Sequence, residues 1–242
     1  MKANIIIILA LVFIGFMADA RVVNVDSLAR EHQVGVVLDV SKHQGVIDFE
    51  KVASSVRFLY VRATAGSDYV DPRFIKNVQA ASAAGMLVGV YHVYSDRSSP
   101  RTQAAHFMES IKGLDLDLLP VVDVERCESL DSLRVLLDEI ETAYGVKPMV
   151  YSYETLYRHR LQNLGQYKLW IARFSRNMPN IVGDIFLWQF SENGSLPGID
   201  RPVDVSRFMG DYDARAIMFS RKQPSGDAKK KPRHGRRHRP EE

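Results

Sequence analysis

The chain has a single cysteine, Cys127, among its 242 residues, so no disulfide can form within it. After the first twenty residues, it has no further apolar stretch long enough to span a membrane. It also lacks Cys/His clusters, the HExxH spacing of zinc sites and a glycine-rich loop for phosphate. No motif therefore predicts a metal ion or another cofactor. Because no catalytic His and Asn/Asp motif accompanies Cys127, we expect that residue to pack in the core rather than act as a nucleophile.

The first twenty residues have the pattern of a secretory signal peptide. Lys2 supplies a short positive region, and residues 5–17 are almost wholly apolar but too few to cross a bilayer comfortably. Ala18-Asp19-Ala20 provides the small residues of a cleavage site, which predicts cleavage before Arg21. The mature protein is then expected to be secreted or periplasmic. An uncleaved N-terminal anchor is the alternative interpretation.

Positive charge is concentrated at the C-terminus. Residues 221–242 hold nine Lys or Arg and three acids, although the net charge of the whole chain is only +3. The segment has no apolar periodicity, so we assign 216–242 to a basic disordered tail, 21–215 to one folded domain and 1–20 to the signal peptide. Such a tail suits an anionic cell wall or membrane surface. An increase in solubility is the alternative role, and nothing else in the chain indicates specific binding to nucleic acid.

Between these segments the sequence alternates between strand-like and helix-like patterns. Helices are expected between the first six strands, one opening at Asp71-Pro72, one at Pro100 and one capped by Ser129. From Asn177 onward the links are short and leave little room for helices. The pattern predicts an α/β fold, a TIM-like parallel barrel of about five βα units and three further strands with an irregular C-terminal third. The expected strands are Val34–Ser41, Arg57–Thr64, Leu87–Tyr94, Leu118–Glu125, Pro148–Tyr153, Tyr167–Phe174, Asp184–Ser191 and Val203–Phe208.

The fourth of these strands ends in two carboxylates, Asp123 and Glu125. Side chains alternate faces along a strand, so both should point the same way, with Cβ atoms roughly 6.5–7 Å apart. Two carboxyl groups on one face suit glycoside hydrolysis, in which one donates a proton to the leaving oxygen and the other stays ionised. Because Glu125 follows a strongly apolar strand, we expect it to be buried beside Asp123. Two solvated acids at a strand end are the alternative.

Other strands also end in polar or aromatic residues. In a parallel barrel these ends meet at one rim, where the active site lies. Aromatic faces stack on sugar rings, and carboxylates bind hydroxyl groups or transfer protons. His92 by itself is expected to be a structural histidine with satisfied hydrogen bonds. The candidate rim residues are Asp39, Ser41, Arg62, Thr64, Tyr91, His92, Asp123, Glu125, Tyr151, Tyr153, Trp170, Arg173, Trp188, Gln189 and Asp204.

Motifs in a fixed order extend from about Gly35 to Gly210. They include Gly35-Val36-Val37-Leu38-Asp39-Val40-Ser41, Gln44-Gly45, Gly89-Val90-Tyr91-His92, Leu119-Pro120-Val121-Val122-Asp123-Val124-Glu125, Leu169-Trp170-Ile171-Ala172-Arg173, Leu187-Trp188-Gln189-Phe190-Ser191 and Val203-Asp204. Together they resemble the family-25 glycoside hydrolases, also called Chalaropsis-type lysozymes. The Asp-x-Glu spacing alone is weak evidence, whereas about ten motifs in the right order are strong.

The resemblance implies a barrel of five βα units and three further strands. It implies a muramidase that cleaves the β-1,4 bond between N-acetylmuramic acid and N-acetylglucosamine in the glycan strands of peptidoglycan. Glu125 matches the general acid, and Asp123 matches the carboxylate that assists the substrate acetamido group. Asp39 and Asp204 match the other acids of the site. The matching substrate-binding positions are Arg62, Tyr91, Tyr151 and Trp188. We expect a monomer without a metal ion.

The sequence departs from the family pattern after the second strand. Many members read Lys-Ala-Thr-Glu-Gly there, whereas this chain reads Arg62-Ala63-Thr64-Ala65-Gly66, so a carboxylate is absent at Ala65. Two alternatives remain: an endo-N-acetylglucosaminidase or chitinase-type hydrolase, and a glycan-binding module without turnover. The first commonly places more acids just ahead of the catalytic Glu, and here Asp115 and Asp117 lie outside that spacing. The four acids argue against the second.

Overall fold

The computed structural model describes residues 22–27, 35–209 and 217–218. The predicted signal peptide and most of the predicted tail lie outside the described residues. The strands are β1 (Val23–Asn24), β2 (Val36–Val40), β3 (Phe58–Ala65), β4 (Tyr69–Val70), β5 (Leu87–Val93), β6 (Val121–Val124), β7 (Met149–Tyr153), β8 (Leu169–Ala172), β9 (Ile185–Leu196) and β10 (Ile199–Phe208). The helices are η1 (Lys42–Gln44), α2 (Phe49–Ala53), α3 (Phe74–Ala83), α4 (Pro100–Ser110), α5 (Leu130–Tyr144), α6 (Glu154–Leu156), the π-helical η2 (Tyr157–Leu161) and η3 (Gln162–Leu164).

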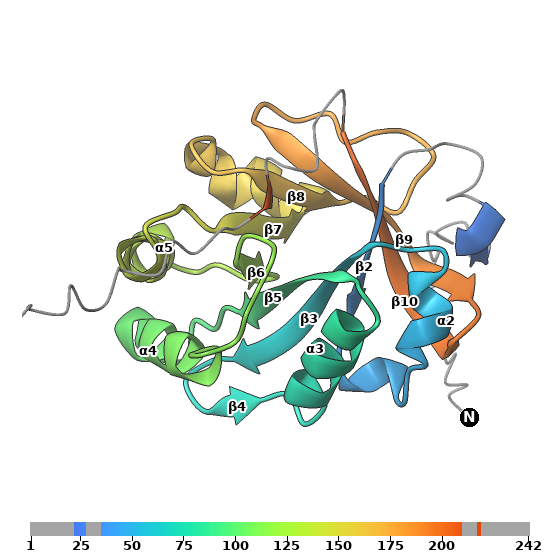
Figure 1. Cartoon of the computed structure of the whole chain (residues 1–242). Helices are drawn as coiled ribbons and strands as arrows, with labels where there is room; N and C mark the ends of the chain where they lie inside the picture. The colour runs from blue at the N-terminus through green and yellow to red at the C-terminus, as the bar shows by residue number, and fades with distance from the viewer. Residues whose placement is uncertain (1–21, 28–34, 210–216, 219–242) are drawn as a thin grey trace, which may run out of the picture.

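Eight of the strands form a closed barrel, as the sequence predicts. Their order is β2-β3-β5-β6-β7-β8-β9-β10, and β10 pairs back with β2 (Figure 1). Each of the eight predicted strand segments contains or overlaps one of these strands. The short strands β1 and β4 pair with β9 and β3 outside the ring.

The last strand corrects two sequence expectations. β10 runs antiparallel to both of its neighbours, so the barrel is not parallel throughout. The strand also begins at Ile199 rather than Val203. Only Pro197 and Gly198 separate β9 from β10, and Gly198 has a φ of 99°. Two residues suffice for a hairpin, whereas a parallel crossover needs a dozen or more.

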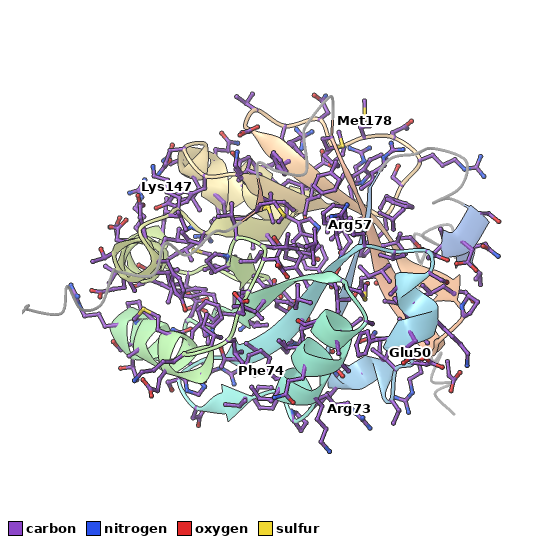
Figure 2. The ribbon with its side chains drawn as sticks, in the orientation of Figure 1. Glu50, Arg57, Arg73, Phe74, Lys147 and Met178 are labelled. Atoms are coloured by element: carbon purple, nitrogen blue, oxygen red, sulfur yellow. The ribbon has the colours of Figure 1, made fainter. Side chains whose placement is uncertain are left out.

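The three long helices lie outside the strands (Figure 1). α4 begins at Pro100 and α5 follows its cap Ser129, as predicted, whereas α3 begins at Phe74, two residues after Asp71-Pro72. Ser129 caps α5 by accepting a hydrogen bond from the Ser132 amide at 3.2 Å, and Gly145 ends it with a φ of 70°. The buried stripe of α5 is Leu133, Leu136, Leu137 and Ile140, at the helical spacing seen in the sequence. Figure 2 shows Arg73, just before α3, at the periphery of the molecule. Between Gly165 and Met209 the chain contains no helix, as the short links predict.

The barrel interior is filled by aromatic side chains that contact one another across the ring. Tyr60 of β3 and Trp170 of β8 have ring centroids 5.0 Å apart, although three strands separate them in the sheet. The Trp170 indole N–H donates to Ser206 Oγ of β10 at 2.9 Å. Gly89 leaves the space for Tyr60, because a Cβ there would lie 2.4 Å from Tyr60 Cε1. This packed layer forms the floor beneath the polar residues that follow along each strand.

Two described residues that follow the predicted domain boundary at residue 215 contact the barrel. Ile217 is fully buried, and its carbonyl accepts a hydrogen bond from the Leu119 amide at 2.8 Å. Met218 forms a bridge with Leu118. Ile217 packs with the barrel, because its apolar side chain is removed from water, whereas the Met218 side chain is 39% exposed.

Candidate active site

A cavity of about 130 Å³ lies above the aromatic floor. On the parallel strands, a polar side chain of the cavity lies two residues after a residue of the floor, because alternate residues of a strand share a face. Arg62 follows Tyr60 in this way, and Tyr91 follows Gly89. The lining residues are Asp39, Arg62, Tyr91, Val121, Asp123, Glu125, Tyr151, Tyr153, Trp170, Phe174, Gln189, Glu192 and Asp204. Strands distant in sequence thus deliver polar groups to one place.

Seven of the eight predicted site residues line this cavity together. They are Asp39, Arg62, Tyr91, Asp123, Glu125, Tyr151 and Asp204. The exception is Trp188, which lines a neighbouring cavity of about 860 Å³. Its ring carries the Arg207 guanidinium 4.4 Å from the centroid, and its indole N–H donates to the Arg173 carbonyl at 2.8 Å. At 2% exposure, Trp188 lies beside the smaller cavity rather than in its wall.

The two carboxylates of the Asp-x-Glu motif occupy different environments. Asp123 is buried in β6, and its Oδ1 has no hydrogen-bond partner within the described part of the chain. Burial raises the pKa of Asp123 well above its ordinary value, and the nearby charge of Glu125 raises it further. Glu125 is exposed, so the expectation that it would be buried was wrong. The reason is that β6 ends at Val124, which places Glu125 in the bend at the rim.

Asp39 and Asp204 form a second carboxyl pair, set by the antiparallel pairing of β2 and β10. The two residues are direct partners in the register, and their side chains are hydrogen-bonded to each other. Burial raises the pKa of Asp39 to about 7, and the charge of Asp123 adds to this effect. Burial and the charge of Asp39 raise the pKa of Asp204 to about 9. Neighbouring carboxyl groups that cannot all be ionised retain protons near neutral pH.

One cation lies among these acids. Within the described part of the chain, Arg62 is the only Lys or Arg that lines the 130 Å³ cavity, beside the carboxyls of Asp39, Asp123, Glu125, Glu192 and Asp204. Its guanidinium carbon lies 5.6 Å from the Tyr91 ring centroid. The cavity therefore has an excess of acids and favours groups that donate hydrogen bonds or develop positive charge.

Further residues shape the cavity. The sequence places Gln189 and Tyr153 at the rim without a role, whereas it does not indicate Glu192 and Phe174. Gln189 accepts a hydrogen bond from Tyr151 Oη at 2.8 Å and donates from Nε2 to Asp39 Oδ2 at 2.9 Å. Glu192 reaches the cavity because β9 is twelve residues long and continues past the rim. Tyr153 and Phe174 form an aromatic edge, with ring centroids 6.5 Å apart. The position of Gln189 next to Trp188 was visible in the sequence, but its partners depend on the register of three strands.

His92 has the structural role that the sequence indicates. It is fully buried, with Nδ1 2.8 Å from Thr64 Oγ1 and Nε2 3.3 Å from Gln103 Oε1. Burial lowers the pKa of His92 to about 4, so the ring is neutral at pH 7. Cys127 is also buried, and burial raises the pKa of its thiol. Among the described residues, no group of three or more His, Cys, Asp or Glu could hold a metal ion, and no helix is long and apolar enough to cross a membrane.

Glu125 stands between two hollows. It lines the cavity of about 130 Å³ and also a hollow of about 380 Å³ that includes Tyr94, Arg97 and Arg126. A further hollow of about 440 Å³ next to Arg97 is lined by Ala65, so the missing family carboxylate does not belong to the cavity that holds Asp123. The surface is thus recessed on both sides of Glu125, as a polymeric substrate requires.

The profile of the Glycosyl hydrolases family 25 matches residues 38–199, which is more than half of the chain. The chain belongs to this family. The match includes Asp39, Asp123 and Glu125 and ends before Asp204. As a family 25 member, the protein is a glycoside hydrolase, in agreement with the resemblance found in the sequence.

Known proteins similar to this family 25 hydrolase share most of its barrel. "Uncharacterized protein YegX" from Escherichia coli (strain K12) is 32% identical over 187 residues, covering 72% of this chain and 69% of that protein. "Autolytic lysozyme" from Clostridium acetobutylicum is 32% identical over 179 residues, covering 71% of this chain and 55% of that protein. The structure of a family 25 glycosyl hydrolase from Bacillus anthracis has a TM-score of 0.64 and 27% identity, covering 74% and 91% of the two chains.

Proposed function

We propose that this protein is a peptidoglycan-degrading muramidase that hydrolyses the β-1,4 bond between N-acetylmuramic acid and N-acetylglucosamine. Family membership and the lysozyme among its relatives support the reaction. The observation that carries the residue assignment is the contrast between an exposed Glu125 and a buried Asp123 with an unpartnered oxygen at the same cavity. The two carboxyls have different tasks because they have different surroundings.

Glu125 is the general acid in this proposal. It lies at the junction of two hollows, so a glycan strand that occupies both would pass its scissile oxygen beside this carboxyl. Protonation of that oxygen by Glu125 breaks the glycosidic bond and releases one product strand. The resulting carboxylate then accepts a proton from the water that completes hydrolysis.

Asp123 assists the substrate acetamido group. Its Oδ1 has no partner in the described residues, which leaves an acceptor for the acetamido N–H. The carbonyl oxygen of that group attacks the anomeric carbon, and positive charge develops on the amide as the ring forms. Burial disfavours the Asp123 anion in the free protein. The negative charge of Asp123 is therefore stabilised most when positive charge develops on the substrate amide. The mechanism retains the β configuration without a glycosyl-enzyme bond.

The remaining side chains of the cavity bind and orient the sugar. Tyr91 and Tyr151 line the wall, and Tyr153, which is 36% exposed, presents its ring at the rim with Phe174. Aromatic faces of this kind stack against the C–H faces of sugar rings. Arg62 supplies the cation of the cavity and is placed to bind substrate oxygens.

The first test is a Glu125→Gln variant assayed on purified peptidoglycan. Loss of a general acid should lower turnover by about two to four decades. Glu109→Gln makes the same change on the exposed side of α4, outside the lining of the cavity, and should retain wild-type turnover. Circular dichroism verifies that both variants are folded. More than about a tenth of the wild-type activity in folded Glu125→Gln protein would refute the assignment.

The second test identifies the products. Mass spectrometry of the digest should find muramic acid at the new reducing ends, whereas glucosamine ends would establish the endo-N-acetylglucosaminidase alternative. NMR in early turnover should show a β product. An α product, or a trapped covalent adduct on Asp123, would refute the substrate-assisted mechanism.

We also propose that the mature enzyme acts outside the cytoplasm as a monomer. The signal-peptide pattern of residues 1–20 supports export, and the basic tail suits an anionic cell wall or membrane surface. N-terminal sequencing of the protein recovered from the periplasm or medium should begin at Arg21. Protein found only in the cytoplasm would overturn this proposal.

A further inference from the structure

A directed chain of hydrogen bonds crosses the cavity from β7 to β10. Tyr151 Oη donates to Gln189 Oε1 at 2.8 Å, and Gln189 Nε2 donates to Asp39 Oδ2 at 2.9 Å. Asp39 is in turn hydrogen-bonded to Asp204. Tyr151, Gln189 and Asp39 are all nearly inaccessible to solvent, with exposures of 8%, 3% and 8%. The direction of each hydrogen bond matters, because two buried donors that face each other would leave both without an acceptor and would cost free energy.

The amide favours one location for the shared proton. Gln189 presents its N–H to Asp39 Oδ2, which acts as an acceptor. A hydrogen bond between two carboxyls needs one proton. An N–H donor stabilises an ionised carboxylate more than the carbonyl oxygen of a protonated carboxyl, so the Gln189 bond favours the proton on the partner of Asp39. We propose that Gln189 is a positioning residue that holds Asp39 ionised and keeps the shared proton of the pair on Asp204.

The surroundings of the pair agree with one retained proton. Asp123, Glu125 and Glu192 face the same cavity and disfavour a second anion in the pair, while Arg62 is the cation that partly compensates. The phenols of Tyr91, Tyr151 and Tyr153 line the wall as neutral groups. Both carboxyls also reach the larger cavity, whose other titratable residues are His43, Arg176 and Arg207. Burial raises the pKa of both carboxyls, so one proton is retained in the pair near neutral pH.

The proton order has a functional consequence. Asp204 acts as a neutral hydrogen-bond donor and Asp39 as the anion beside Asp123. Loss of the proton at high pH would place two like charges in direct contact and add negative charge next to Asp123. Gln189 thereby sets how many charges the site holds when the substrate arrives. This consequence assumes that the cavity is the active site, as proposed above.

Carbon-13 NMR of the free protein tests the proton order without any assay of activity. The two carboxyls should titrate in two steps, with Asp39 ionising in the first and Asp204 in the second. In Gln189→Leu the donor is absent, so the carboxyl carbons of both residues should respond in both steps. Gln189→Glu is a second variant of native shape, which can donate to Asp39 only while protonated. Gln189→Glu should keep the wild-type order of ionisation, Asp39 before Asp204, while the new carboxyl is protonated. It should lose that order once the new carboxyl ionises. A proton retained by Asp39, or an unchanged order in both variants, would overturn the proposal.

Activity provides a second readout through matched substitutions. Asn is neutral and carries a donor, so it can replace a protonated Asp204 better than an ionised Asp39. The kcat of Asp39→Asn should therefore fall at least about tenfold further than that of Asp204→Asn, and the gap should close in the Gln189→Leu background. An equal loss in both variants, or the reverse order, contradicts the assignment. If Glu125→Gln remains active while the NMR order holds, the proposed catalytic roles fail and the proton assignment stands.

Discussion

Neutralising Asp204 should make the protein more stable while it damages the site. The ordinary pKa of this side chain is 3.8, and in the fold it is raised to about 9 by burial and by Asp39. At pH 7 the carboxyl is thus ionised in the unfolded chain and protonated in the folded one, so folding must include uptake of a proton. Asp204→Asn removes this requirement, since the amide is neutral in both states.

The size of the effect follows from the same values. One pKa unit corresponds to about 1.4 kcal/mol, so the interval from 3.8 to pH 7 amounts to about 4 kcal/mol as an upper limit. Asp204 is partly accessible and shares its proton with Asp39, and both effects reduce the gain to about 2 kcal/mol. For a domain of this size such a gain raises the Tm by roughly 4–8 °C.

The pH dependence separates this cause from ordinary packing effects. A carboxyl with a raised pKa costs nothing below its unfolded value and costs more as pH rises toward the folded value. The free energy of unfolding, measured by urea denaturation, should therefore differ little between wild type and Asp204→Asn at pH 4, with the difference growing toward pH 9. Asp200→Asn, an exposed change on the same strand, should show no such trend. A difference that is constant with pH, or largest at pH 4, would refute the reasoning.

Three further predictions concern the floor, the rim and the tail. Gly89→Ala places a Cβ 2.4 Å from Tyr60 Cε1 and should lower the free energy of unfolding in urea by about 1–3 kcal/mol. Gly165→Ala, with φ −60° and no contact of the new Cβ closer than 3.9 Å, should be neutral or slightly stabilising, and equal effects would contradict the packing argument. Glu154 Oε2 accepts from Arg173 Nη1 at 2.7 Å, so Glu154→Gln should lower the free energy of unfolding by about 1–3 kcal/mol at pH 7. This cost should shrink as pH falls through the lowered pKa of wild-type Glu154, and a cost that does not shrink in acid would count against the ion pair. Deleting Arg221–Glu242 should weaken pelleting with intact walls at low salt but not at high salt, and leave cleavage of a soluble muropeptide unchanged; a lower Tm would instead assign the tail to the fold.

Local sequence patterns determined the parts of this protein that depend on neighbours along the chain. Runs rich in Val, Ile, Leu, Tyr and Phe located the eight barrel strands, and Ser129 marked the start of α5, because strand and helix-cap preferences depend on residues close together in the sequence. The alternation of side chains along a strand placed Asp123 and Glu125 on one face at a strand end. Ordered motifs then indicated the family, which the profile match confirms.

Tertiary structure decided everything that depends on register between distant strands. The antiparallel β10 sets Asp204 opposite Asp39, and β9 brings Gln189 between Asp39 and Tyr151. No local pattern could have specified these contacts, because a slip of one residue in either strand would turn the side chains to the other face. The exposure of Glu125 likewise follows from where β6 stops in the closed sheet. The sequence supplied the acids of the site, while closure of the barrel determined which of them are buried, paired and protonated.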